Sequence, residues 1–459
     1  GYVDQPAFSI WVLAGWTAIF GDSVHAIRIL PAVCGAGLVV LTGAIAARFG
    51  GGRWAQAFAA CGAGIGAAGL AIAGFYSMNC FDLVFWAAAF YLLVVIADTG
   101  DGRWWPWFGL VVGLGLFNKI GLAVLGMAVV AGLLLTEHRR QLADWRLYAG
   151  GALAAAFLAP YVLWNMASGW PTGEFISNAK QLKITAASPL EFLSENILQA
   201  NPVNLVLWLP GLLWLLLARR ARSHRIIGLI CVAVWVLLVI QKSKPYYFAS
   251  VVPVMLAAGA VAFEGWTGGG RWRWARWVMA ANLAIGLAIF VPIGLPVLAP
   301  AALAEYQARL GIAPRPAEVS HVSTLPQHFS DRFGWQGLAR TEAEVYGGLD
   351  PDERRRTVVV GSNYGHAGAM EYWSDTYDLP PVYSGHNNYW FWGPPSEPGI
   401  EVVIATGVQR ERLLEYFEEV EVVAYSEEQW ALESSISVSV CRRPKRPLVE
   451  IWPEVKSFL

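Results

Sequence analysis

The sequence predicts a polytopic α-helical membrane protein with a C-terminal extracytoplasmic α/β domain. Of its 459 residues, 56% are hydrophobic and only 15% are charged, and the mean hydropathy of +0.44 lies outside the usual range of soluble domains. Apolar stretches dominate up to residue 300, and the composition then becomes charged and polar. We therefore expect a membrane domain at residues 1–300 and a soluble domain at residues 301–459. The net charge of −1 argues against a nucleic-acid binder, a class that usually carries a basic surplus.

Ten apolar segments approach the roughly 20 residues that a helix needs to cross a bilayer. They cover residues 27–47, 54–74, 81–97, 104–117, 120–135, 147–166, 203–218, 226–240, 247–263 and 274–297. The fourth and fifth segments are short and would form either a thin hairpin or a re-entrant pair. Neither choice changes the topology of the later segments.

The distribution of basic residues predicts the orientation. Arginines gather in alternate loops, on the side that the positive-inside rule makes cytoplasmic: Arg48, Arg53, Arg103, Arg139, Arg140, Arg146, Arg219, Arg220, Arg222, Arg225, Arg271, Arg273 and Arg276. The opposite side carries few cations. The start of the chain and everything after residue 297 are therefore expected outside the cytoplasm.

Two further segments are expected to form helices on the outer membrane surface. Residues 7–20 are apolar but too short to span comfortably, and residues 188–191 read Ser-Pro-Leu-Glu, a capping box with Pro at the first helical position. Leu190, Leu193 and Ile197 would form the apolar face of the second helix. The alternative for residues 168–199 is a solvated loop. Because the chain begins at Gly1 in a polar stretch, we also expect that the first helix and first loop are missing.

The C-terminal residues alternate between strand and helix patterns. Residues 333–349 and 410–420 have helical spacing, while residues 357–360, 401–404 and 421–424 are short apolar runs typical of buried strands. Residues 436–440 alternate strictly, which favours a half-buried strand at a sheet edge. These elements predict a small α/β domain with a largely parallel sheet.

Three lysines interrupt apolar stretches on the side that has few other cations. They are Lys119 and the pair Lys242 and Lys244, which precede Tyr246 and Tyr247. An ionisable group at a membrane boundary is costly unless it is paired or hydrated, so it indicates a functional site. The ligand would be a lipid-linked phosphate, with a tyrosine hydroxyl as a further donor. The alternatives are lysines that only extend towards water and tyrosines of the interfacial belt.

Four short runs together carry a family resemblance. Residues 1–6 (GYVDQP), 76–82 (YSMNCFD), 117–119 (FNK) and 242–247 (KSKPYY) resemble bacterial glycosyltransferase family 39. Aminoarabinose transferases and protein O-mannosyltransferases are relatives with the same C-type membrane fold. Residues 363–369 and 384–390 resemble the soluble tail of bacterial members.

The resemblance implies a glycosyltransferase of the bacterial inner membrane. It would move a sugar from a polyprenyl-phosphate donor to a hydroxyl of a lipid, glycan or protein acceptor at the outer face. This chemistry needs a carboxylate that accepts the hydroxyl proton and cations that stabilise the departing phosphate. The family's main acidic residue follows the first helix, upstream of Gly1.

The resemblance also suggests residue roles. Asp4 would be the catalytic carboxylate among the residues present, with helix capping as the alternative. Gln5 would bind substrate at a position where the family often has a basic residue. The other substrate-binding candidates are Lys119, Lys242, Lys244, Tyr246, Tyr247, His386 and Asn387.

Some assignments compete with plainer ones. Asn79 and Asp82 are expected to form interhelical hydrogen bonds rather than to act in catalysis. His386 and Asn387 would contribute to acceptor recognition, or their loop would only pack against the rest of the protein. The histidines show no ligand-spaced cluster, and the sequence leaves the need for a divalent metal open. The rival functions are a transporter or flippase for an anionic lipid and an assembly protein.

Overall fold

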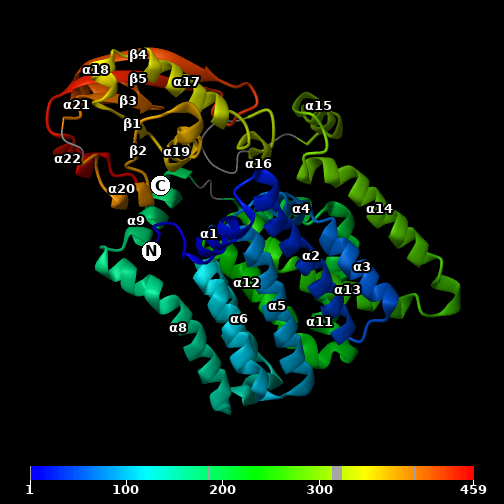
Figure 1. Ribbon diagram of the computed structural model, residues 1–459. Helices are drawn as coiled ribbons and strands as arrows, with labels where there is room; N and C mark the ends of the chain where they lie inside the picture. The colour runs from blue at the N-terminus through cyan, green and yellow to red at the C-terminus, as the bar shows by residue number, and fades with distance from the viewer. Residues whose placement is uncertain (1, 184–186, 313–322, 397–398) are drawn as a thin grey trace. The chain divides into compact units, whose positions relative to one another are not determined.

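The computed structural model describes residues 2–183, 187–312, 323–396 and 399–459 (Figure 1). The chain divides into two compact units. The helical unit contains Gln5–Ala167 and Ala186–Ala299, and the sheet unit contains Tyr2–Asp4, Ser168–Thr185 and Pro300–Leu459. Two short segments that the sequence grouped with the membrane domain therefore fold with the C-terminal residues.

The helical unit has a helix at each of the ten expected apolar segments. Its α-helices are α1 (Phe8–Phe20), α2 (Val24–Arg48), α3 (Arg53–Gly64), α4 (Ala67–Ala73), α5 (Met78–Thr99), α6 (Trp105–Asn118), α7 (Ala123–Leu135), α8 (Trp145–Ala167), α10 (Pro189–Gln199), α11 (Leu205–Leu217), α12 (Arg225–Ile240), α13 (Val252–Trp266) and α14 (Ala275–Gly294). The 3₁₀ helices η5 (Pro202–Asn204), η6 (Arg219–His224) and η7 (Pro245–Ser250) precede α11, α12 and α13.

Fewer of these helices are long enough to span a membrane than the sequence suggested. Within the described residues, five helices have sufficient length and apolar composition, and three bent pairs raise the number to at most eight. The pair α3 and α4 bends by 66°. Two of the ten expected spans, α6 and α13, are only 14 and 15 residues long. The protein is a polytopic helical membrane protein, but its helix lengths do not support ten full spans.

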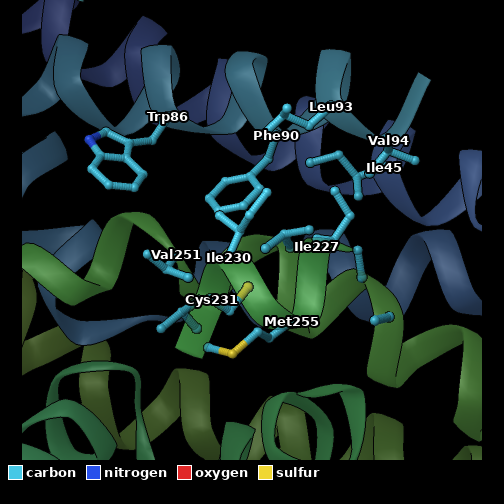
Figure 2. Packing of buried hydrophobic residues seen from close by; sticks show 14 of the residues in the cluster. Ile45, Trp86, Phe90, Leu93, Val94, Ile227, Ile230, Cys231, Val251 and Met255 are labelled. Atoms are coloured by element: carbon cyan, nitrogen blue, oxygen red, sulfur yellow. The ribbon is translucent and has the colours of Figure 1, made fainter. Parts of the chain in front are cut away.

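The centre of the helical unit is α5. Of the residues in its most apolar 18-residue stretch, 72% are buried, whereas the corresponding share in α8 is 17%. Figure 2 shows Trp86 and Phe90 of α5 facing Ile230 of α12 and Met255 near the start of α13. Burial of this apolar surface against neighbouring helices places α5 inside the bundle, so polar groups at its ends are held by several elements.

The sheet unit contains a five-stranded sheet in the order β2-β1-β3-β5-β4. The strands are β1 (Thr357–Gly361), β2 (Val382–Tyr383), β3 (Val402–Thr406), β4 (Phe417–Glu427) and β5 (Ser435–Pro444). The helices are α9 (Pro171–Asn178), α15 (Pro300–Leu310), α16 (Gln327–Ser330), α17 (Trp335–Gly347), α18 (Pro351–Arg354), α19 (Tyr364–Tyr377), α20 (Asn388–Trp392), α21 (Arg410–Tyr416) and α22 (Leu448–Ile451). The expected α/β domain is present.

Three details of this domain differ from the sequence-based prediction. The sheet is mixed: β1 pairs in parallel with β2 and β3, whereas β5 is antiparallel to both β3 and β4. The strand at residues 436–440 belongs to β5, which is internal, since it pairs on both sides. The helix expected at 410–420 ends at Tyr416, because Phe417 begins the long strand β4. Pairing between distant strands decided all three outcomes.

Each face of the sheet has its own core. Val359, Ile404 and Val438 pack with Leu338 of α17 and Met370 of α19 on one face. The other face has a separate cluster in which Leu413 of α21 packs on the sheet; it contains Val358, Val403, Ala405, Phe417, Val420 and Cys441. Consecutive strand residues point to opposite faces, so the continuous apolar runs of β1 and β3 supply both cores.

One carboxyl group is fully buried against this sheet. Glu342 of α17 is 0% exposed and accepts a hydrogen bond from the Thr406 hydroxyl at the end of β3. Burial raises the pKa of Glu342 from its ordinary value of 4.5 to about 7, although the Thr406 hydrogen bond opposes that shift. The protonated form is therefore the one that the folded sheet unit favours.

This burial predicts a pH dependence of stability. Because the folded pKa is raised, the unfolded chain loses the Glu342 proton first, and the stability of the sheet unit should fall as the pH rises from 4.5 to about 7. The loss is at most about 3.5 kcal/mol, since the two pKa values differ by about 2.5 and one pKa unit corresponds to about 1.4 kcal/mol. Thermal unfolding at pH 5 and pH 8 measures it. Glu342→Gln should remove this component, and an identical pH response in wild type and variant would contradict the assignment.

Candidate functional site

The side chain of Lys119 is buried at one end of the helical bundle. It follows α6 directly, and its backbone N–H donates to the Gly115 carbonyl oxygen, which ends that helix. The Lys119 ammonium donates to Asn79 Oδ1 at 2.9 Å and lies 3.5 Å from Asp82 Oδ2. The exposed fractions of the Lys119 and Asp82 side chains are 4% and 10%. Asn79 and Asp82 therefore act as interhelical partners, as expected.

Two tyrosines of η7 cover the same ammonium. Lys119 Nζ lies 4.1 Å from the ring centroid of Tyr247 and 5.5 Å from that of Tyr246. The two rings meet edge to face, with centroids 4.7 Å apart. Cation–π attraction is strongest where water is excluded, and this contact links the loop that carries Lys242 and Lys244 to the end of α6.

The charge of Lys119 is thus largely balanced within the protein. An ammonium has three protons to donate, and here an amide oxygen, a carboxylate and an aromatic face surround it. This arrangement offsets the desolvation of a buried cation. Direct binding of a phosphate by Lys119 would require one of these contacts to give way, so its geometry suits the positioning of η7.

Gln5 is also engaged by the helical unit. Its Oε1 accepts a hydrogen bond of 3.3 Å from the Ile120 backbone N–H, one residue after Lys119. The helix α1 that follows packs through Phe8, whose ring lies 5.4 Å from the rings of both Phe81 and Phe85. The helix expected at 7–20 is therefore present, and Gln5 connects its start to the Lys119 turn.

Lys242 and Lys244 occupy the loop between α12 and η7. Lys242 is exposed and has a φ of +53°, a left-handed conformation that turns the chain after the end of α12. Lys244 is half-buried and directly precedes Pro245, the first residue of η7. Because Tyr246 and Tyr247 contact Lys119, the fold brings all three predicted lysines to one end of the bundle.

The helix α10 holds this loop in place. Its capping box is formed, with the Ser188 hydroxyl accepting from the Glu191 N–H, so the predicted second surface segment is a helix. Asn196 is 3% exposed; its amide nitrogen donates to the Pro245 carbonyl oxygen at 2.8 Å and its Oδ1 accepts from Trp235 Nε1 at 3.2 Å. Asn196 was not among the residues predicted from the sequence. The signal was an amide within an otherwise apolar helical face.

The predicted apolar face of α10 was partly wrong. Leu193 and Ile197 pack against the core, but Leu190 is 75% exposed. Phe192 is the buried hydrophobic residue at the start of the helix, and its ring meets that of Trp235 at 6.1 Å. The buried face of α10 therefore differs from the predicted one, because Phe192 and Asn196, four residues apart, both point towards α12 and η7.

Replacing Asn196 with Ala should destabilise the helical unit by about 1–3 kcal/mol, because it leaves the partly buried Trp235 N–H and Pro245 carbonyl without their partner. Thermal unfolding of the purified protein in nanodiscs measures the loss. Leu190→Ala on the same helix is the matched control and should change stability by less than about 0.5 kcal/mol. Equal melting temperatures for both variants would show that Asn196 does not hold the loop.

Asp4 belongs to the sheet unit, together with Tyr2 and Val3. The Val3 backbone N–H donates to Asn388 Oδ1 at 2.7 Å. The N-cap of α1 is Ala7 and makes no side-chain capping bond. Asp4 therefore does not occupy the N-cap position of α1, and its role as the catalytic carboxylate stays a prediction.

His386 and Asn387 lie together where the C-terminal tail joins the sheet unit. The Asn387 amide nitrogen donates to the Leu459 carbonyl oxygen at 3.2 Å, and its Oδ1 accepts from the Leu459 N–H at 3.2 Å. His386 is 6% exposed, and its ring lies 5.0 Å from that of Tyr364. The Asn387 side chain thus holds Leu459 through two hydrogen bonds. Acceptor binding by His386 and Asn387 stays a prediction.

No group of three or more His, Cys, Asp or Glu residues is placed to hold a metal ion within the part of the chain that the structure describes.

Comparisons with known proteins agree with this architecture. Residues 4–164 match the family model described as dolichyl-phosphate-mannose-protein mannosyltransferase. The fold is similar to that of ArnT from Cupriavidus metallidurans in the apo state, with a TM-score of 0.58 and 16% identity over 96% of this chain and 88% of that one. The predicted resemblance to glycosyltransferase family 39 is confirmed. No curated protein matches in sequence.

The fold is also similar to that of ArnT from C. metallidurans bound to undecaprenyl phosphate. It matches with a TM-score of 0.54 and 17% identity, again over 96% of this chain and 88% of that one. The family-model match at residues 4–164 includes Asp4, Gln5, Asp82 and Lys119. The loop with Lys242 lies outside it, and its connection to the site rests on the contacts of η7 with Lys119.

Proposed function

We propose that this protein is a membrane glycosyltransferase that moves a sugar from a polyprenyl-phosphate donor to an acceptor hydroxyl. The observation that carries the proposal is the ArnT-like fold over 96% of the chain, together with the family match at residues 4–164. The undecaprenyl phosphate bound in one ArnT structure is the kind of leaving group that the proposed reaction releases. The acceptor would be a lipid, a glycan or a protein.

The reaction would be a displacement at the anomeric carbon of the sugar. The acceptor oxygen forms a bond to that carbon while the bond to the phosphate oxygen breaks, and the polyprenyl phosphate departs with the bonding electrons. We assign Asp4 to accept the proton of the acceptor hydroxyl. Its support is its position at the start of the matched family segment.

The loop of residues 241–244, between α12 and η7, would stabilise the charge of the departing phosphate; we call it the lysine loop because it carries Lys242 and Lys244. Preorganised cations at a developing negative charge lower the barrier most where water is partly excluded. Lys244 is half-buried and Lys242 is exposed at the end of α12, so Lys244 would be the principal phosphate contact. Lys119 is a positioning residue in this proposal, since Asn79 and Asp82 already hold its ammonium against the η7 tyrosines. Gln5 would also be a positioning residue, because it accepts a hydrogen bond from the Ile120 N–H next to Lys119.

The direction of the chain in the membrane is also part of the proposal. Arginines concentrate in alternate loops between the apolar segments, which supports an inner-membrane protein whose lysine loop and sheet unit lie on the extracytoplasmic side. Cysteine labelling with a membrane-impermeant reagent in intact cells tests this. A Cys introduced at Lys242 should react, and one introduced at Arg220 should not.

The activity itself is tested with the purified chain in nanodiscs and undecaprenyl-phosphate-linked sugars of several kinds, including aminoarabinose and hexoses. The expected result is the release of undecaprenyl phosphate, with the sugar transferred to an added acceptor or to water. An intact donor after prolonged incubation with every sugar would contradict the proposal. Transbilayer movement of the uncleaved lipid in liposomes would instead favour the transporter that the sequence left as an alternative.

A further inference from the structure

We propose that the sheet unit has a second ligand site, at the carboxyl ends of β1 and β3, that takes an amphiphilic anion. The ligand would combine one phosphate or carboxylate group with an apolar body and a hydrogen-bond donor. This inference uses only residues of the sheet unit and does not depend on sugar transfer.

The topology of the sheet places a crevice between these two strands. β1 and β3 are parallel neighbours, with Gly361 beside Thr406 at their carboxyl ends. The helix after β1, α19, packs on one face through Met370, and the helix after β3, α21, packs on the opposite face through Leu413. In open α/β sheets, ligands bind where the connections of adjacent strands diverge in this way.

A cavity of about 420 Å³ lies at this position, within the usual size range of small-molecule sites. The ends of the two strands contribute Gly361 and Gly407, and a side chain at Gly407 would collide with the Ser362 hydroxyl and the His366 ring. The remaining wall is mostly apolar and includes Val403, Leu413, Phe417, Leu448, Trp452 and Val455. The body of a ligand would therefore be hydrophobic.

The Ser362 hydroxyl is a polar group in the cavity wall, and its hydrogen bond to His366 determines whether it can donate to a ligand or accept from one. The Ser362 hydroxyl, at the turn between β1 and α19, lies 2.9 Å from His366 Nδ1, and His366 Nε2 lies 3.1 Å from Glu433 Oε2. A carboxylate only accepts, so Nε2 carries the imidazole proton and Nδ1 accepts from Ser362. The Ser362 oxygen is left with its lone pairs for the cavity. It can receive a hydrogen bond from a ligand hydroxyl or amide.

The charge at the cavity comes from Arg412. Its side chain lines the cavity and is exposed, and it forms no ion pair or hydrogen bond with any residue that the structure describes. Arg442 and Arg446 of the same unit are paired with Glu353 and Glu454. A guanidinium without a carboxylate partner beside an apolar cavity suits a phosphate or carboxylate, which it can bind through two parallel hydrogen bonds.

The experiment uses the full chain in nanodiscs and two photoreactive probes. The first is a water-soluble dodecyl phosphate with a diazirine on the chain, and the second is a phosphatidic acid with the same group in one acyl chain. Crosslinked peptides are identified by mass spectrometry. The expected labels lie on the segments that line the cavity, β3 to α21 or α22. Labelling by the soluble probe identifies a free amphiphile as the ligand source, and labelling by the lipid alone identifies a membrane lipid.

Three variants decide the result. Arg412→Ala should reduce labelling about tenfold or more, because it removes a charge-assisted contact, and Leu448→Trp should block the cavity to a similar extent. The matched control is Arg355→Ala, which should label as wild type does; Arg355 is an exposed arginine between α18 and β1 that pairs with Asp352. Circular dichroism and the melting temperature verify folding. Equal labelling in all variants, labels outside the cavity, or no labelling by either probe would overturn the proposal.

Discussion

Replacing Lys119 with Met is expected to lower the free energy of unfolding of the helical unit by about 3–5 kcal/mol, the usual cost of breaking a buried ion pair. The change leaves the Asp82 carboxylate, whose side chain is only 10% exposed, without the ammonium that lies 3.5 Å from it. It also removes the donor to Asn79 Oδ1 and the cation over the Tyr247 ring. Thermal unfolding in nanodiscs, followed by tryptophan fluorescence, measures the loss.

The double variant Lys119→Met with Asp82→Leu is the control for this prediction. Removing both charges leaves no uncompensated ion, so stability should recover most of what the single variant loses. Sugar transfer should not recover with it, because the η7 tyrosines would still lack the cation that holds them. A single variant as stable as the wild type would mean that the Lys119 and Asp82 side chains do not interact in the folded protein.

The Lys119 site shows how far the sequence could predict a buried polar cluster. A lysine between apolar segments indicated a site by itself, and polar residues at the start of α5 indicated hydrogen bonding between helices. The sequence could not identify Tyr247 as the ring against the ammonium or Gln5 as the partner of Ile120. These contacts join residues more than one hundred positions apart, and local patterns carry no information about such pairs.

The helical segments show a similar limit. Hydropathy located each apolar helix, because the composition of a segment is a local property. It did not predict the 66° bend between α3 and α4, where Gly64 ends one helix and Gly66 precedes the next. Hydropathy therefore overestimated the number of unbroken spans.

In the sheet unit, the sequence predicted the strands but not which strands pair with one another. Short apolar runs correctly predicted β1 and β3, whose residues face a core on each side. The alternation in β5 indicated one buried face, yet the strand lies between β3 and β4. Alternation describes the two faces of a strand, whereas an edge or central position depends on which neighbours pair with it.

The lysine loop carries the largest expected effect on activity. Replacing Lys242 and Lys244 together with Ala should lower the rate of sugar transfer by about 100-fold or more, the loss typical when a preorganised group at a developing negative charge is removed. The melting temperature should change little, because Lys242 is exposed and the loop keeps the Asn196 contact to Pro245. Release of undecaprenyl phosphate in nanodiscs measures the rate.

The single variants separate the two lysines. Lys244→Ala should account for most of the loss, since Lys244 is half-buried and a charge there is screened less by water and salt than that of the exposed Lys242. The matched control is Arg219→Ala with Arg220→Ala, two exposed cations in η6 at the opposite end of α12, which should leave the rate unchanged. An unchanged rate in the Lys242 and Lys244 double variant would remove the phosphate role from this loop. In that case the end of α6 would have to supply the charge, which requires Lys119 to exchange Asp82 for the donor phosphate.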